Sequence, residues 1–149
     1  MTLVVDVAVD GVRTPLSRAR VAALARGVLR AEHVKNALLS IALVSTRRIA
    51  ALNRAHLRRS GPTDVIAFGF APVGGGGPIV GDIYIAPDVA RVAARDNGVP
   101  VREELARLVV HGTLHVLGYD HPEDRTRTAS PMWRRQERLV ARLLRPGAR

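Results

Sequence analysis

The stretch that most constrains this chain runs from residue 111 to residue 121 and reads HGTLHVLGYDH. His111 and His115 are four residues apart, so on an α-helix both side chains lie on one face, one turn apart. Gly118 is expected to end that helix, because glycine adopts the left-handed conformation without a steric penalty. The turn that follows can return His121 to the same point. Three imidazoles placed in this way suit a tetrahedral zinc ion with one position left for water, so the sequence predicts a catalytic metal site.

The same spacing occurs in the metzincin motif H-E-x-x-H-x-x-G-x-x-H, in which the glutamate is the general base of a protease. In this chain Gly112 takes the place of that glutamate, and glycine cannot transfer a proton. The chain therefore has the three metal-binding histidines of this motif but lacks its general base. A metal-dependent hydrolase acting on a peptide or another non-RNA substrate remains an alternative, and the glycine argues against it.

The net charge and the cysteine content limit the classes of binding partner that the chain can have. The formal net charge is +10, which favours polyanions and above all nucleic acid. Aromatic residues make up only 3% of the chain, so we expect contacts mainly to phosphates rather than stacking on bases. The chain has no cysteine, which excludes a disulfide-linked partner and leaves histidine as the natural ligand for a transition metal.

Hydrophobic periodicity predicts an α+β fold. Strands are expected at 2–9, 37–44, 65–70 and 79–86, and helices at 17–32, from 45 or 46, at 87–97, from 100 through the histidine pair, and from 131. We expect a glycine-rich hairpin connection over 71–78 and a polar loop over 122–129. The prediction is a single domain over 1–149, with a mixed sheet of about four strands packed with about five helices, one of them a zincin-like metal helix. The N-terminus lacks the features of a signal peptide and no segment resembles a membrane span, so a cytoplasmic protein is expected.

The stretch 111–121 resembles the H-G-x-L-H-L-x-G-Y-D-H signature of the YbeY family of bacterial endoribonucleases, which are also called rRNA maturation factors. Further segments are similar to that family: Asn53 followed by 62–68 (PTDVIAF) matches N-(x8)-P-T-D-V-L-S-F, 81–85 (GDIYI) matches G-D-I-x-I, and Met132 with Gln136 and Glu137 matches M-x-x-x-Q-E. The resemblance implies a small α+β protein with one zinc-like ion on the three histidines. It also implies cleavage of single-stranded RNA in 16S rRNA 3′-end maturation and ribosome quality control, in association with the small ribosomal subunit.

The chain departs from the family at one position. An arginine usually lies four residues after the position of Asn53, and here that position is Leu57. The candidate substrate-binding residues are therefore the neighbours Arg54, Arg58 and Arg59. Arg58 or Arg59 can take the arginine role only if the helix ends before Arg58, because a shift of one helical position turns a side chain by about 100°.

Phosphodiester cleavage also needs a base. The candidates are two carboxylates, Asp64 and Asp82, or the water that the metal itself activates. Asp120 is expected to orient His121 or to close the turn. Besides the endoribonuclease and the non-RNA hydrolase, a third hypothesis is a ribosome-binding protein whose metal is only structural.

Overall fold

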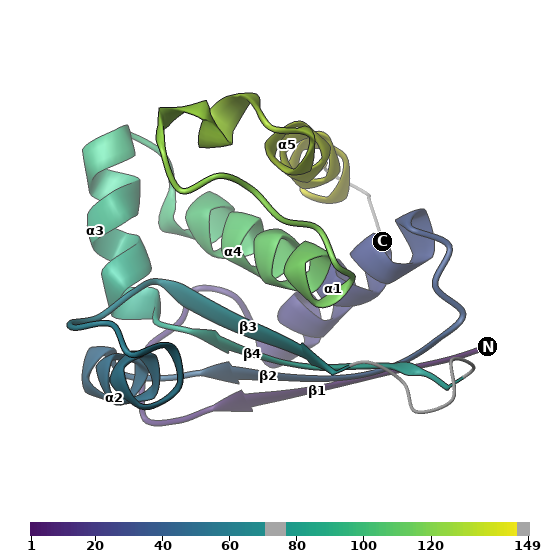
Figure 1. The fold of residues 1–149 in the computed structure, drawn as a ribbon, viewed down its shortest axis with the longest axis horizontal. Helices are drawn as coiled ribbons and strands as arrows, with labels where there is room; N and C mark the ends of the chain where they lie inside the picture. Colours follow the sequence, from purple (N-terminus) through teal and green to yellow (C-terminus); the bar gives the residue numbers. More distant parts are fainter. Residues whose placement is uncertain (71–76, 146–149) are drawn as a thin grey trace.

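The computed structural model describes residues 1–70 and 77–145, and within them four strands form one mixed sheet against which the helices pack (Figure 1). Along the chain the elements are β1 (Thr2–Val9), α1 (Arg18–Ala31), β2 (Asn36–Leu43), α2 (Thr46–Leu57), β3 (Val65–Phe70), β4 (Ile79–Ile85), α3 (Pro87–Asn97), α4 (Val101–Val116), the 3-10 helix η2 (Arg125–Ala129) and α5 (Pro131–Leu143). The expected α+β class, with its mixed sheet and its helix carrying the histidine pair, is confirmed.

The local signals placed most of these elements correctly. Ser17, Ser45 and Ser130 begin α1, α2 and α5, and each side-chain oxygen accepts a hydrogen bond from a backbone N–H of the first turn. The polar loop expected over 122–129 is wrong in part, because it contains η2, which Asp124 caps by accepting from the Thr126 N–H at 2.8 Å. The glycine-rich connection predicted over 71–78 lies largely outside the described residues.

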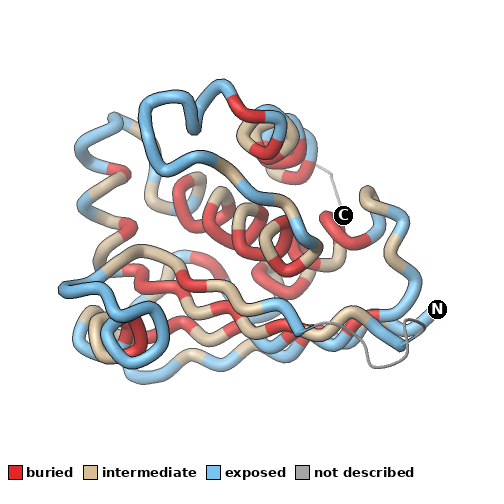
Figure 2. The backbone as a smooth tube through the Cα atoms, viewed as in Figure 1, coloured by how far each residue is buried: buried red, intermediate tan, exposed pale blue. Residues whose placement is uncertain are grey.

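The strand order is β1-β2-β4-β3. The neighbours β1, β2 and β4 run parallel, and β3 is antiparallel to β4. Parallel strands need a crossover, which α1 supplies between β1 and β2. Helices α1 and α4 cover one face of the sheet, and α5 packs on the far side of α4 (Figure 1). Most of the buried core residues belong to the strands, α1 and α4, so the main core lies between the sheet and these two helices (Figure 2).

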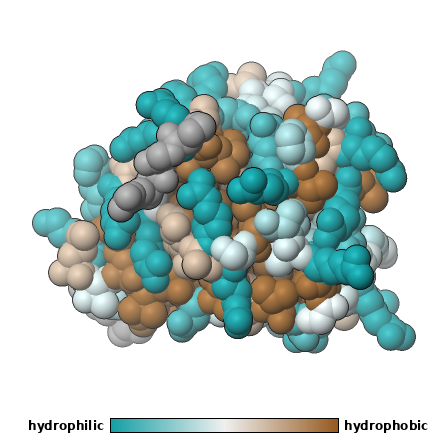
Figure 3. Space-filling view, turned by 180° about the vertical axis from the view of Figure 1, so that it is seen from behind, coloured by the Kyte–Doolittle hydropathy of each residue, from teal (hydrophilic) through white to brown (hydrophobic). Residues whose placement is uncertain are grey.

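A smaller apolar cluster lies on the other face of the sheet, where α2 packs over one end of β3 and β4. Its buried members are Val44, Ile49, Leu52, Ile66 and Ala86. Seen from behind, the molecule shows hydrophobic areas separated by hydrophilic side chains (Figure 3). No helix among residues 1–70 and 77–145 is both long enough and apolar enough to cross a membrane.

Helix α4 lies so close to β3 and β4 that the contacts require glycine. A Cβ atom built on Gly81 would lie 2.4 Å from Cγ1 of Val116, and one built on Gly112 would lie 2.8 Å from Cγ2 of Ile83. Gly112 therefore points into the sheet. The glycine in place of the protease glutamate therefore has a packing reason.

Candidate metal centre

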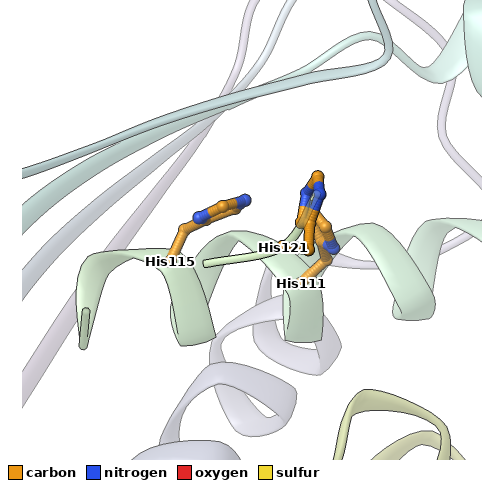
Figure 4. A group of neighbouring side chains, drawn as sticks. All are labelled: His111, His115 and His121. Atoms are coloured by element: carbon orange, nitrogen blue, oxygen red, sulfur yellow. The ribbon is translucent and has the colours of Figure 1, made fainter. Parts of the chain in front are cut away.

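The three predicted histidines come together at the C-terminal end of α4 (Figure 4). One nitrogen atom from each of His111, His115 and His121 lies within 4.8 Å of the other two. Leu117 ends the helix, and Gly118 follows with a φ of 102°, in the left-handed region that favours glycine. All three imidazoles are half-buried, so the site combines a fixed geometry with access from solvent.

The turn between Gly118 and His121 is held from two sides. The Asp120 carboxylate accepts a hydrogen bond from the backbone N–H of His121 at 2.8 Å, so it closes the turn as expected. The Tyr119 hydroxyl is hydrogen-bonded to Glu32 at the end of α1, and Arg135 of α5 donates to the same carboxylate at 2.7 Å. These contacts attach the turn to two helices and limit the positions that His121 can take.

Hydrogen bonds also orient two of the rings. Nδ1 of His111 lies 2.6 Å from Oε1 of Gln136, and because that oxygen only accepts, the ring donates from Nδ1 and keeps Nε2 for a metal. Nδ1 of His121 likewise donates to the Pro122 carbonyl at 2.9 Å. The Gln136 amide donates to Glu137 at 3.0 Å, which directs its oxygen toward the histidine. Arg107 donates in turn to the Glu137 carboxylate at 2.8 Å.

Burial favours the neutral form of His111 and His115. Burial lowers the pKa of His111 to about 4, and the hydrogen bond to Gln136 opposes this shift only in part. Burial and the charge of His121 also lower the pKa of His115. A neutral imidazole is the form that binds a metal ion, so the site is prepared for coordination at neutral pH.

The histidines open into a cavity of about 380 Å³. Its wall is formed by α4, the end of α2, the start of β3 and the segment that leads into η2, through Leu57, Arg59, Thr63, Asp64, Val65, Ile66, Ala67, His111, His115, His121, Glu123 and Arg127. A cavity of this size, with a few convergent polar groups, is typical of a small-ligand site or of a site for one unit of a polymer.

Of the two candidate carboxylates, the structure brings only Asp64 to this cavity. Burial raises the pKa of Asp64, and hydrogen bonds to backbone N–H groups and the charge of Arg127 oppose the shift only in part. Asp82 pairs with Ser40 and Phe68 in the sheet. Its neighbours along β4 face α4, so alternation places Asp82 on the opposite face of the sheet, away from the histidines. The prediction that Asp82 is a candidate base at the metal site is therefore corrected, because its side chain lies on the other face of the sheet.

The structure also shows which of the three candidate arginines reaches the cavity. Helix α2 ends at Leu57, and Arg58 follows with a φ of 54°, so the condition that the helix end before Arg58 is met. Arg59 then lines the cavity and pairs with Glu123 at 3.1 Å. Arg54 and Arg58 are exposed and are not among the residues that line the cavity.

Sequence reasoning missed four residues around the site. Gln136 and Glu137 were noted only as part of a motif, and their contact with His111 crosses from α5 to α4. Glu123 and Arg127 lie in a segment without periodicity, so no pattern indicated which side chains there face the histidines. Their proximity to the signature was the only signal available.

Comparisons with known proteins identify the family that the chain resembles. A family model described as endoribonuclease YbeY matches residues 10–144. The chain is 40% identical over 144 residues to "Endoribonuclease YbeY" of Anaeromyxobacter dehalogenans, covering 94% of this chain and 73% of that protein. It is 42% identical over 134 residues to the protein of that name from Anaeromyxobacter sp. strain Fw109-5, covering 87% and 68%. The solution structure of TM1509 from Thermotoga maritima has a similar fold, with a TM-score of 0.60, 24% identity, and coverage of 91% of this chain and 86% of that one.

Proposed function

The chain belongs to the endoribonuclease YbeY family, and we propose that it is a metal-dependent endoribonuclease that cleaves single-stranded RNA in rRNA processing. The observation that carries this proposal is a cavity lined by three imidazoles, a half-buried carboxylate and two arginines. The net charge of +10 supports a polyanionic substrate. We extend the proposal to the whole chain as one domain, acting in the cytoplasm on rRNA of the small ribosomal subunit.

The donor set supports zinc as the metal. Three neutral nitrogen ligands suit zinc and related transition metals, whereas magnesium and calcium prefer oxygen ligands. His111, His115 and His121 would hold one ion per chain. When bound, zinc would polarise the phosphodiester and lower the pKa of a coordinated water.

Three side chains would perform the other steps of the reaction. Asp64, with its raised pKa, is suited to accept a proton from the attacking nucleophile and to return one to the leaving oxygen. Gln136 keeps the His111 ring in one orientation and one tautomer. Arg59, at the wall of the cavity, is placed to attract the RNA backbone.

Both alternatives have less support. A protease base in place of Gly112 would point at Ile83 of β4, where even a Cβ atom would be only 2.8 Å away. A purely structural metal is normally enclosed by four protein ligands, and these three histidines line an open cavity.

One preparation tests the proposal. Metal content is measured by elemental analysis, and cleavage is measured on a single-stranded RNA, on the same RNA in a duplex, and on a peptide. The His115→Ala variant should lose both the metal and RNA cleavage. His33→Asn is the matched control, because His33 is exposed, has a φ of 61° that asparagine tolerates, and lies outside the cavity. Cleavage of peptide instead of RNA, or RNA cleavage that survives loss of the metal, would refute the proposal.

A further inference from the structure

Two arginines line the cavity, and they differ in their partners. Both carboxylate oxygens of Glu123 accept hydrogen bonds from Arg59 at 3.1 Å, so its charge is already matched. The guanidinium of Arg127 has neither an ion pair nor a hydrogen bond within residues 1–70 and 77–145. Its N–H donors are therefore available to a ligand in the cavity.

The position of Arg127 is well defined although its side chain is exposed. It lies inside η2, and its backbone carbonyl accepts from the Ser130 hydroxyl at 2.7 Å. Ser130 is also the N-cap of α5, so this contact attaches η2 to a long helix. The guanidinium carbon lies 5.7 Å from the centre of the Trp133 ring, at cation–π distance. Stacking of this kind holds the guanidinium while its N–H groups stay free to donate at the edge.

Arg127 also lies at the junction of two hollows. It lines the cavity with the histidines and a smaller one of about 90 Å³ beside it, and Asp64 and His111 line both as well. The free donors thus share a wall with the proposed base and with a proposed metal ligand. A phosphate group bound between these groups would offer oxygens to the guanidinium in the bidentate geometry that arginine prefers.

We infer that Arg127 is the residue that binds the RNA phosphodiester beside the metal, an inference that rests on the proposed function. Because Arg59 forms an ion pair with Glu123, it contributes less to phosphate binding than Arg127 does. Arg59 can bind a phosphate only if its ion pair with Glu123 breaks. The family arginine that is missing at Leu57 therefore does not have to be replaced by another residue of α2, because Arg127 of η2 supplies the positive charge at the same cavity.

The protein supplies its own reporter for this contact, because Trp133 is its only tryptophan. The metal-loaded protein is titrated with a short single-stranded RNA that carries 2′-O-methyl groups, and Trp133 emission is followed. Phosphate binding to the stacked guanidinium should change the emission of the parent protein. Arg127→Ala should weaken the apparent affinity about tenfold, the usual loss for a hydrogen bond between charged groups. Arg125→Ala is the matched control, since Arg125 belongs to the same 3-10 helix, is exposed, and lines neither hollow.

Cleavage of unmodified RNA at matched metal content gives a second measurement. Arg127→Ala should lower the rate at saturating RNA about 10- to 100-fold, as expected for loss of a donor to developing charge. Arg127→Lys should recover part of this loss because it restores the charge, which shows that the loss does not come from misfolding. Arg125→Ala should match the parent.

The two measurements separate the two proposals. If Arg127→Ala binds and cleaves like Arg125→Ala, the inference is overturned, whatever the parent does. If the parent does not cleave RNA but only Arg127→Ala loses the binding signal, the phosphate site stands and the proposed endoribonuclease activity fails.

Discussion

The close contact between α4 and the sheet predicts that Gly81→Ala destabilises the protein. The added Cβ would lie 2.4 Å and 2.6 Å from the two methyl carbons of Val116 and 3.0 Å from the Phe68 carbonyl oxygen. Ordinary carbon contacts are about 3.5–4.0 Å, so α4 and β4 must separate by about 1 Å. Overpacking of this kind costs about 1–3 kcal/mol, and the smaller chain entropy of alanine returns about 0.5–1 kcal/mol. The net loss should therefore lie between about 0 and 2.5 kcal/mol, with a midpoint of about 1 kcal/mol.

A second substitution tests whether this contact is the cause. Val116→Ala removes both crowding methyl groups and by itself should cost about 1.5–2.5 kcal/mol in lost burial. If the methyl groups oppose the new Cβ, the double variant should be more stable than the sum of the two losses predicts, by about 1 kcal/mol or more. Urea unfolding followed by circular dichroism measures each free energy.

Gly98→Ala gives the matched control. Gly98 has a φ of 67° and open space around its Cβ position, so its substitution is strained by the backbone alone. Its loss should add to that of Val116→Ala within about 0.5 kcal/mol. If Gly81→Ala also proves additive with Val116→Ala, the steric account of the α4 contact is refuted.

Three further outcomes are expected. Gln136→Leu should weaken metal affinity about 10- to 100-fold in a competition titration with a chelator, because the ring that it orients loses its acceptor, while the circular dichroism spectrum stays unchanged. In RNA cleavage assays Arg59→Ala should lower the rate several-fold and Arg58→Ala should have no effect, since Arg59 lines the cavity and Arg58 does not; equal rates for both would contradict this. Burial raises the pKa of Glu137, but hydrogen bonds from Arg107 and Gln136 outweigh it and hold that pKa below the ordinary 4.5. This carboxylate therefore stabilises the fold above about pH 4.5 and loses its contribution as the pH falls through the lowered pKa. In urea titrations at a series of pH values, the free energy of unfolding of Glu137→Gln should therefore decrease less on acidification than that of the parent.

The sequence by itself determined the features that depend on neighbours a few residues apart. Two histidines four apart on a helix, a glycine that ends it and a third histidine after the turn place three imidazoles together, because helix geometry and the left-handed preference of Gly118 are local properties. Serine caps and strand alternation located most helices and strands for the same reason. The family signature adds the implied chemistry to these positions.

Only the tertiary structure decided which distant groups join the histidines. Alternation along β4 separates Asp82 from Gly81, but only the packing of α4 on the Gly81 side shows that Asp82 faces away while Asp64 reaches the cavity. Likewise, the bond from His111 to Gln136 and the exposure of Arg127 to the cavity depend on how α5 and η2 fold back over α4. Such contacts join residues far apart in the chain, and they follow from the packing of whole faces rather than from any local pattern.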